Sequence, residues 1–151
     1  MSRQSPETYL GAKRNEFLAN GTPGEVGAKK FNLPQKFEIN KLYLGGTWSV
    51  GPEDSESQGL DSSVVYPFFA KKVFLVMSAA APVEAEILID GKPATAANKG
   101  GDVRIVDGKA IVTVSDSRLY SLYEGTESGE HTITIKPAGA GLKAFAFTFG
   151  S

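Results

Sequence analysis

Apolar and polar residues alternate through the second half of the chain, in short runs separated by turns that contain glycine. The clearest runs are VEAEILID, DVRIV, KAIVTV, RLYSLYEG, GEHTITIKP and LKAFAFTFG, between positions 83 and 150. Alternation with a period of two places every second side chain on the same face of a β-strand. Breaks roughly every 8–12 residues are typical of β-sandwiches. The sequence therefore predicts an all-β fold of two packed sheets.

Local signals within this half predict particular turns and a central strand. The pairs Asp107-Gly108 and Asp90-Gly91 each follow an alternating run. Such pairs supply the positive φ angles of type I′ turns, so we expect a hairpin at 107–108 and a similar turn at 90–91. The last run carries phenylalanine at positions 145, 147 and 149. Each exposed ring would forgo about 1.5–3 kcal/mol, so we expect all three to be buried in a central strand.

The first half is less regular. Residues 64–70 and 72–78 are largely apolar and predict two strands inside a sheet, whereas residues 51–63 form a polar loop. Residues 37–40 alternate and predict the first strand. Residues 1–30 lack this pattern, so we interpret them as an irregular N-terminal arm or linker, followed by the sandwich at 31–151. Tyr9, Leu10 and Phe17 make the arm apolar enough to dock on this domain or on a neighbour.

Charge and composition exclude several classes of function. Sixteen basic and seventeen acidic residues are distributed without blocks and give a net charge of −1. Neither a nucleic-acid footprint nor a patch for anionic membranes is indicated. The chain has no cysteine, which excludes disulfides and thiolate chemistry within it. No apolar run approaches the roughly 20 residues of a membrane helix, so we expect no direct membrane insertion by this chain.

Five segments carry a resemblance to a known family. They are PETYLG at 6–11, GTWSVG at 46–51, FAKKV at 69–73, RLY at 118–120 and AFAFTFG at 144–150. In this order and spacing they resemble the C-terminal domain of DipZ-type proteins. These are membrane-anchored, thioredoxin-like thiol:disulfide interchange proteins associated with cytochrome c biogenesis.

The resemblance implies a fold and a cellular context. The expected fold is a jelly-roll β-sandwich of the galactose-binding-like kind, similar to carbohydrate-binding modules. The expected partner is the thioredoxin-like domain of the same parent protein, at a periplasmic or other extracytoplasmic location. In such proteins the Cys-x-x-Cys pair belongs to the thioredoxin-like part, and this chain has no position that matches it.

Three residues are candidates for carbohydrate binding. Trp48 is the only tryptophan, and sugars stack their C–H faces on aromatic rings. Its alternation with Val50 is equally typical of a core residue. Arg118 and Tyr120 alternate on an expected strand, where they would either hydrogen-bond sugar hydroxyls or a carboxylate, or tie the sandwich together.

No motif indicates a catalytic or metal site. Glu53, Asp54, Glu56 and Asp61 crowd one loop, but their spacing matches no EF-hand, and we interpret the loop as solvated. The single histidine, His131, has no nucleophile placed beside it by a motif. We therefore predict a chain without catalytic residues, cofactor or metal.

The sequence leaves two functions open. The first is a non-catalytic accessory domain of an extracytoplasmic thioredoxin-like protein that binds carbohydrate, such as cell-envelope glycan. The second is a structural module that positions the thioredoxin-like domain or its client and binds no sugar. The apolar arm with Tyr9, Leu10 and Phe17 favours the second.

Overall fold

The fold is described from a computed structural model that covers residues 3–151. Every regular element in this part of the chain is a β-strand. None of it forms a helix long and apolar enough to cross a membrane. The strands are β1 (Thr8–Tyr9), β2 (Gly27–Phe31), β3 (Tyr43–Val50), β4 (Ser55–Ser57), β5 (Ser63–Ser78), β6 (Val83–Ile89), β7 (Lys92–Pro93), β8 (Arg104–Val106), β9 (Lys109–Val114), β10 (Arg118–Pro137) and β11 (Lys143–Gly150).

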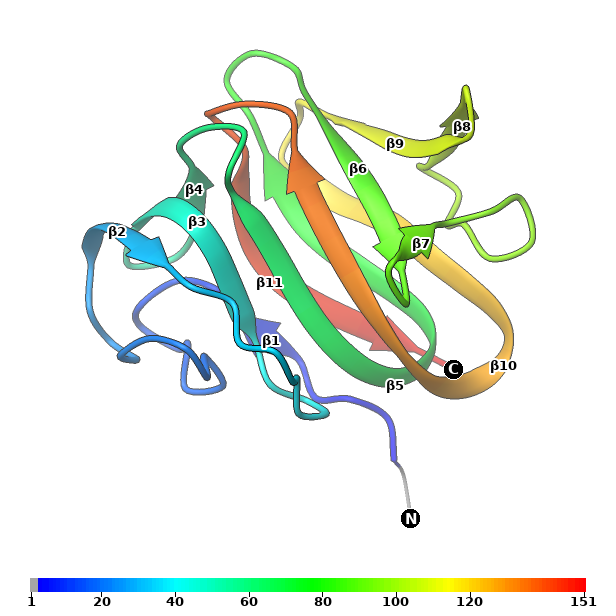
Figure 1. Ribbon diagram of the computed structural model, residues 1–151, viewed down its shortest axis with the longest axis horizontal. Coiled ribbons are helices and arrows are strands. Elements are labelled where there is room, and N and C mark those ends of the chain that lie inside the picture. The colour runs from blue at the N-terminus through cyan, green and yellow to red at the C-terminus, as the bar shows by residue number, and fades with distance from the viewer. Residues whose placement is uncertain (1–2) are drawn as a thin grey trace.

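The strands form a jelly-roll β-sandwich in which two long strands belong to both layers. In Figure 1, β5 runs down the front layer, curves at the bottom and continues in the back layer, whereas β10 begins in the back layer, curves beside β5 and ends in the front layer. The front layer contains β3, the first half of β5, the second half of β10, and β6, β9 and β8. The back layer contains β1, β11 and the other halves of β5 and β10. The expected two-sheet sandwich is confirmed.

The two long strands differ from the sequence-based prediction of four shorter ones. Residues 64–70 and 72–78 lie in the single strand β5, and the runs RLYSLYEG and GEHTITIKP lie in the single strand β10. The pairing of β10 with β5 shifts register between Ser121 and Tyr123 and again between Glu124 and Gly129. Such irregularities bend a strand without ending it, so the paired strands turn from one sheet into the other.

The Asp-Gly turns are confirmed. Asp107 and Gly108 have φ angles of 50° and 78°, and they join β8 to β9. Asp90 and Gly91 have φ angles of 53° and 81°, and they join β6 to β7. Positive φ at both central residues is the geometry that a two-residue type I′ hairpin requires.

The last strand corrects one prediction and confirms another. β11 lies between β1 and β5, so it is central to its layer as expected. Phe147 and Phe149 are buried, but Phe145 is only half-buried. The pairing with β5 shifts register between Ala144 and Ala146, and this extra residue breaks the alternation of the strand. Phe145 therefore does not share the buried face with the other two rings.

The expected first strand at 37–40 is absent, and this prediction is wrong. These residues form an irregular turn in which Asn40 has a φ of 64°. The Phe37 ring packs edge-on against Tyr43, with ring centroids 4.9 Å apart. The Asn40 N–H donates to Pro67 O at 2.8 Å, so the segment covers β5 instead of extending a sheet.

The first thirty residues are mostly irregular and lie against the sandwich. β1 pairs with β11 through Thr8 and Tyr9, and the backbone of Ser5 bonds to Phe69 O at 2.9 Å. The Leu10 side chain is 1% exposed and belongs to the main core cluster. The expected boundary between residues 30 and 31 falls inside β2, which pairs with β3.

Candidate functional site

Trp48 lies in the core of the sandwich. Its side chain is 0% exposed, and its indole N–H lies 3.0 Å from Gly45 O and 3.2 Å from Ser63 O. A buried indole needs a partner for its N–H, and these two carbonyls supply it. The ring therefore offers no open face to a ligand. Of the two roles that the sequence left open for Trp48, this geometry fits that of a core residue.

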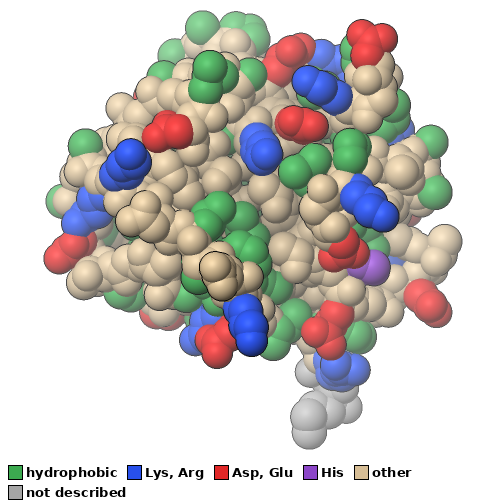
Figure 2. Space-filling model, in the orientation of Figure 1, with side chains coloured by type: hydrophobic (Ala, Val, Ile, Leu, Met, Phe, Trp, Pro, Cys, Tyr) green, Lys and Arg blue, Asp and Glu red, His purple; other side chains and the backbone are tan. Residues whose placement is uncertain are grey.

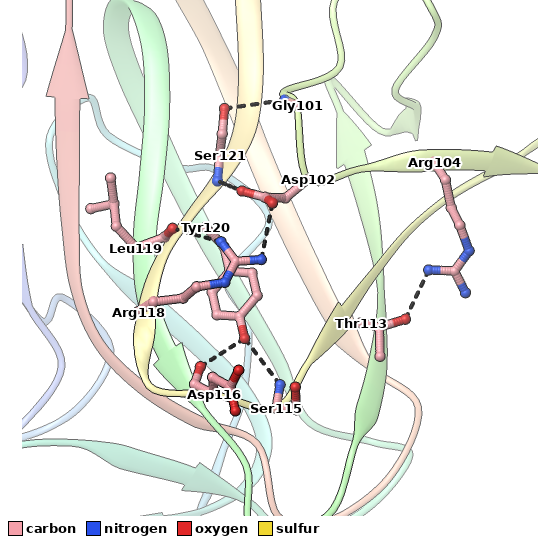
Figure 3. A network of polar contacts seen from close by, with 10 residues as sticks. All are labelled: Gly101, Asp102, Arg104, Thr113, Ser115, Asp116, Arg118, Leu119, Tyr120 and Ser121. Carbon is pink, nitrogen blue, oxygen red and sulfur yellow. Dashed lines mark hydrogen bonds and ion pairs between the residues drawn. The ribbon is translucent and has the colours of Figure 1, made fainter.

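Arg118 and Tyr120 are brought together, and both contribute to structure (Figure 3). The Arg118 guanidinium lies 3.9 Å from the centre of the Tyr120 ring and donates to Asp102 Oδ1 at 3.0 Å. Tyr120 is 1% exposed. Its hydroxyl donates to Asp116 O at 2.7 Å and accepts from the Ser115 N–H at 3.0 Å, which closes the turn before β10. Arg118, whose side chain is 48% exposed, is the accessible member of the pair.

Asp102 joins the loop before β8 to the edge of β10. Its carboxylate accepts from Arg118 and, at 2.7 Å, from the Ser121 N–H. Partial burial on its own would raise the pKa of Asp102. The hydrogen bonds from Arg118 and Ser121 and the charge of Arg118 outweigh burial and hold this pKa below its usual 3.8.

The lowered pKa of Asp102 predicts a pH-dependent contribution to stability. A carboxyl whose pKa is lowered by folding stabilises the fold fully above its unfolded value and loses that contribution as the pH falls through the folded value. We expect Asp102→Asn to lower the free energy of unfolding by about 1 kcal/mol at pH 7, since the ion pair is partly exposed. The difference from wild type should shrink as the pH falls below 3.8. Urea unfolding at several pH values tests this, and a difference that stays constant down to pH 2 contradicts it.

The three carbohydrate candidates do not form one surface. Trp48 is carried by β3, whose residues Tyr43–Gly45 pair with the first residues of β5. Arg118 and Tyr120 pair with Met77 and Leu75 near the other end of β5. Binding by these three residues stays a prediction.

A groove of about 390 Å³ lies on the outer face of the back layer, where β1 and β11 meet. Its floor is formed by Val76 of β5 and by Phe145, Ala146 and Thr148 of β11. The bulge in β11 places the half-buried Phe145 ring here instead of in the core. The volume falls within the range of pockets that hold small organic ligands.

The rim of the groove combines an aromatic ring with charged groups. The Tyr9 hydroxyl donates to a Glu7 carboxylate oxygen, and the Arg14 guanidinium lies 3.9 Å from the centre of the Tyr9 ring. Two further lining residues form an ion pair, in which Lys13 Nζ lies 3.9 Å from Glu53 Oε1. The hydrogen bond to Glu7, and to a lesser degree desolvation, raises the pKa of Tyr9 above its usual 10.0. Tyr9 therefore remains a hydroxyl donor at neutral pH.

The three candidate docking residues have different surroundings. Tyr9 lines the groove, Leu10 is buried in the core, and Phe17 is half-buried in a turn whose backbone bonds to Leu42. Only Tyr9 is therefore part of an accessible hollow. Sequence reasoning selected Tyr9 but missed Phe145 and Arg14, whose role depends on a bulge and on a tertiary contact.

Two other grooves lie elsewhere on the domain. A groove of about 540 Å³ between β6, β9 and the end of β10 has no aromatic ring among its described lining residues. A smaller hollow of about 230 Å³ lies beside His131, whose Nδ1 is 2.6 Å from Asp90 Oδ2. On the front face in Figure 2, positive and negative side chains are interspersed. In residues 3–151, no group of three or more His, Asp or Glu side chains is arranged to hold a metal ion, the acidic loop at 53–61 included.

The chain matches a protein-family model over residues 5–150, which is nearly its whole length. That family is described as the thioredoxin-like C-terminal domain. The chain belongs to this family. As a thioredoxin-like C-terminal domain, it is an accessory domain, and it contains no cysteine of its own.

Curated relatives of this thioredoxin-like C-terminal domain include Protein DipZ of Mycobacterium bovis and Protein DipZ of Mycobacterium tuberculosis. Each is 25% identical to the chain over 146 residues, which are 97% of the chain. The chain spans only 18% of the length of either relative. The resemblance to DipZ-type proteins is thereby confirmed.

Solved structures with a similar fold include carbohydrate esterases. A family two carbohydrate esterase from Cellvibrio japonicus aligns with a TM-score of 0.56 and 14% identity, over 73% of this chain and 31% of the esterase. An active-site mutant of the Clostridium thermocellum enzyme aligns with a TM-score of 0.56 and 15% identity, over the same shares of the two chains. At these identities the likeness shows the fold alone, and it agrees with the expected jelly-roll sandwich.

Proposed function

We propose that this domain is non-catalytic and binds carbohydrate through the groove between β1 and β11. The observation that carries the proposal is the pairing of two accessible aromatic rings, Tyr9 and Phe145, with a polar rim in one open hollow. Aromatic rings stack on the apolar C–H faces of sugars, and the charged rim supplies donors and acceptors for hydroxyls. The likeness to esterases that act on carbohydrate supports the ligand class by analogy.

We prefer this groove to the three residues proposed from sequence, whose role in binding stays a prediction. The Trp48 side chain is fully buried. Polar groups of Arg118 and Tyr120 already form hydrogen bonds within the domain. The groove instead exposes Tyr9 and Arg14 on one side and Phe145 on its floor. A ligand there would lie across β11 and reach the loop at Pro52 and Glu53.

The proposed setting is a larger extracytoplasmic protein. By analogy with DipZ-type relatives, the domain would follow a thioredoxin-like domain in a membrane-anchored parent, on the periplasmic or equivalent side. Thiol chemistry would belong to that other domain, since this chain has no cysteine. The role of this domain would be to hold the parent near glycan of the cell envelope.

Variants of the groove test the proposal. We expect Tyr9→Ala and Phe145→Ser each to weaken binding of a β-1,4-linked oligosaccharide such as cellohexaose by about 1–2 kcal/mol, roughly 5- to 30-fold, because each removes a stacking ring. Isothermal titration measures the affinities. Val106→Ser is the matched control, since Val106 is 43% exposed in the groove without aromatic rings. Equal affinities for wild type, Tyr9→Ala and Phe145→Ser would contradict the proposal.

A second candidate function is docking of the thioredoxin-like domain on the same face. Leu119 is 44% exposed and pairs in register with Val76, which lines the groove. Leu119 therefore extends the apolar surface beyond the groove. A larger exposed apolar surface is typical of a face that binds another protein. Leu119→Ser should weaken capture of a separately produced thioredoxin-like domain and leave oligosaccharide binding unchanged. If the Leu119 variant captures that domain as well as wild type does, this face is not the docking surface.

A further inference from the structure

The charged groups on the groove rim occur in opposite pairs. Lys13 and Glu53 form one ion pair, with side chains 67% and 73% exposed. Arg14 and Glu7 both contact Tyr9, one over its ring and the other at its hydroxyl. Among the described residues that line the groove, these are the only four acidic or basic side chains, so their formal charges cancel.

We propose that these opposed charges make the groove select an uncharged glycan chain over an acidic or a basic chain of the same length. This inference rests on the proposed carbohydrate function and adds the charge class of the ligand. An acidic chain would gain from Lys13 and Arg14 but would be repelled by Glu7 and Glu53. A basic chain would meet the reverse pattern. A neutral chain can use all four groups, because a hydroxyl both donates to carboxylates and accepts from cations.

The charges of Lys13 and Glu53 can be changed without altering the stacking rings of Tyr9 and Phe145. Lys13 lies in the turn after β1, and its N–H donates to Pro52 O at 2.9 Å, so its backbone is fixed beside Glu53. Both side chains are mostly exposed, and exposed ion pairs contribute little to stability. Removing one charge therefore changes the potential of the groove mouth and leaves the fold intact.

Three β-1,4-linked hexamers of equal length test the inference: neutral cellohexaose, its acidic glucuronate counterpart and its basic glucosamine counterpart. We expect wild type to bind cellohexaose more tightly than either charged chain at low salt. Glu53→Gln should strengthen binding of the acidic chain about three- to tenfold, and Lys13→Gln should do the same for the basic chain. Both gains should diminish in 0.5 M NaCl, because salt screens exposed charges.

The exchanged double variant K13E/E53K is the control. It restores the balance of charge, so it should return to the preference of wild type for the neutral chain, and thermal unfolding should confirm that every variant is folded. Equal or tighter binding of a charged hexamer by wild type overturns the inference but leaves carbohydrate binding standing. Failure of all three hexamers to bind contradicts the proposed function itself.

Discussion

Trp48→Ala is expected to lower the free energy of unfolding by about 3–5 kcal/mol, because it empties a fully buried tryptophan site. It also leaves the carbonyls of Gly45 and Ser63 without the indole donor. Urea unfolding measures the loss. Oligosaccharide affinity should remain within about twofold of wild type at temperatures where the variant is folded, since Trp48 does not line the groove.

The opposite pattern would identify Trp48 as a ligand-stacking residue. In that case Trp48→Ala would abolish oligosaccharide binding and leave the unfolding midpoint nearly unchanged. Val106→Ser serves as the control for stability, because substitution of an exposed side chain should change the free energy of unfolding by no more than about 0.5 kcal/mol.

Removal of residues 1–12 is expected to unfold the sandwich or to leave it only marginally stable. The deletion removes β1 from the edge of β11 and takes the buried Leu10 side chain out of the core. Loss of a buried leucine alone costs about 2–5 kcal/mol, against a total stability of about 5–15 kcal/mol for typical domains. Circular dichroism and calorimetric unfolding measure the outcome.

A shorter deletion is the control, because it shortens the chain without removing β1 or Leu10. Among the described contacts, removal of residues 1–3 deletes the exposed ion pair between Arg3 and Glu130 and the stacking of the Arg3 guanidinium 4.4 Å from the centre of the Phe69 ring. It should lower stability by no more than about 1–2 kcal/mol. If the chain without residues 1–12 melts like wild type, the N-terminal segment is a separable arm. The interpretation of residues 1–30 as a docking element would then gain support.

The local parts of the fold could be predicted from sequence. Strands β6, β8 and β9 follow from alternation, and the turns at Asp90 and Asp107 follow from Asp-Gly pairs. Both signals act between neighbouring residues. The continuity of β5 and β10 could not be predicted, because the lysines at 71–72 in β5 and the glycines and polar residues at 124–130 in β10 indicate breaks. In the folded chain the two strands pair along most of their lengths and bend together.

The groove could not be predicted as one site because it joins segments that are distant in sequence. Tyr9, Glu53 and Phe145 meet only when β1 pairs with β11 and the loop after β3 folds beside them. Trp48, Arg118 and Tyr120 were selected by residue type, which does not indicate how exposed a side chain is. In the structure, Trp48 and Tyr120 pack in the core, and Arg118 attaches the loop at Asp102 to β10. Phe145 was expected in the core, and a single bulge moved it to the groove floor.

An NMR titration of the isotope-labelled chain with cellohexaose tests most directly whether the β1–β11 groove binds carbohydrate. We expect saturable shifts of backbone amides in β1, in the first residues of β11 and at positions 52–53, with the Tyr9 and Phe145 ring signals changing in step. We expect amides beside Val106, in the other large groove, to remain unchanged. Shifts centred on Trp48 or on the Val106 groove, or no shift at millimolar cellohexaose, would contradict the assignment of the β1–β11 groove as the carbohydrate site.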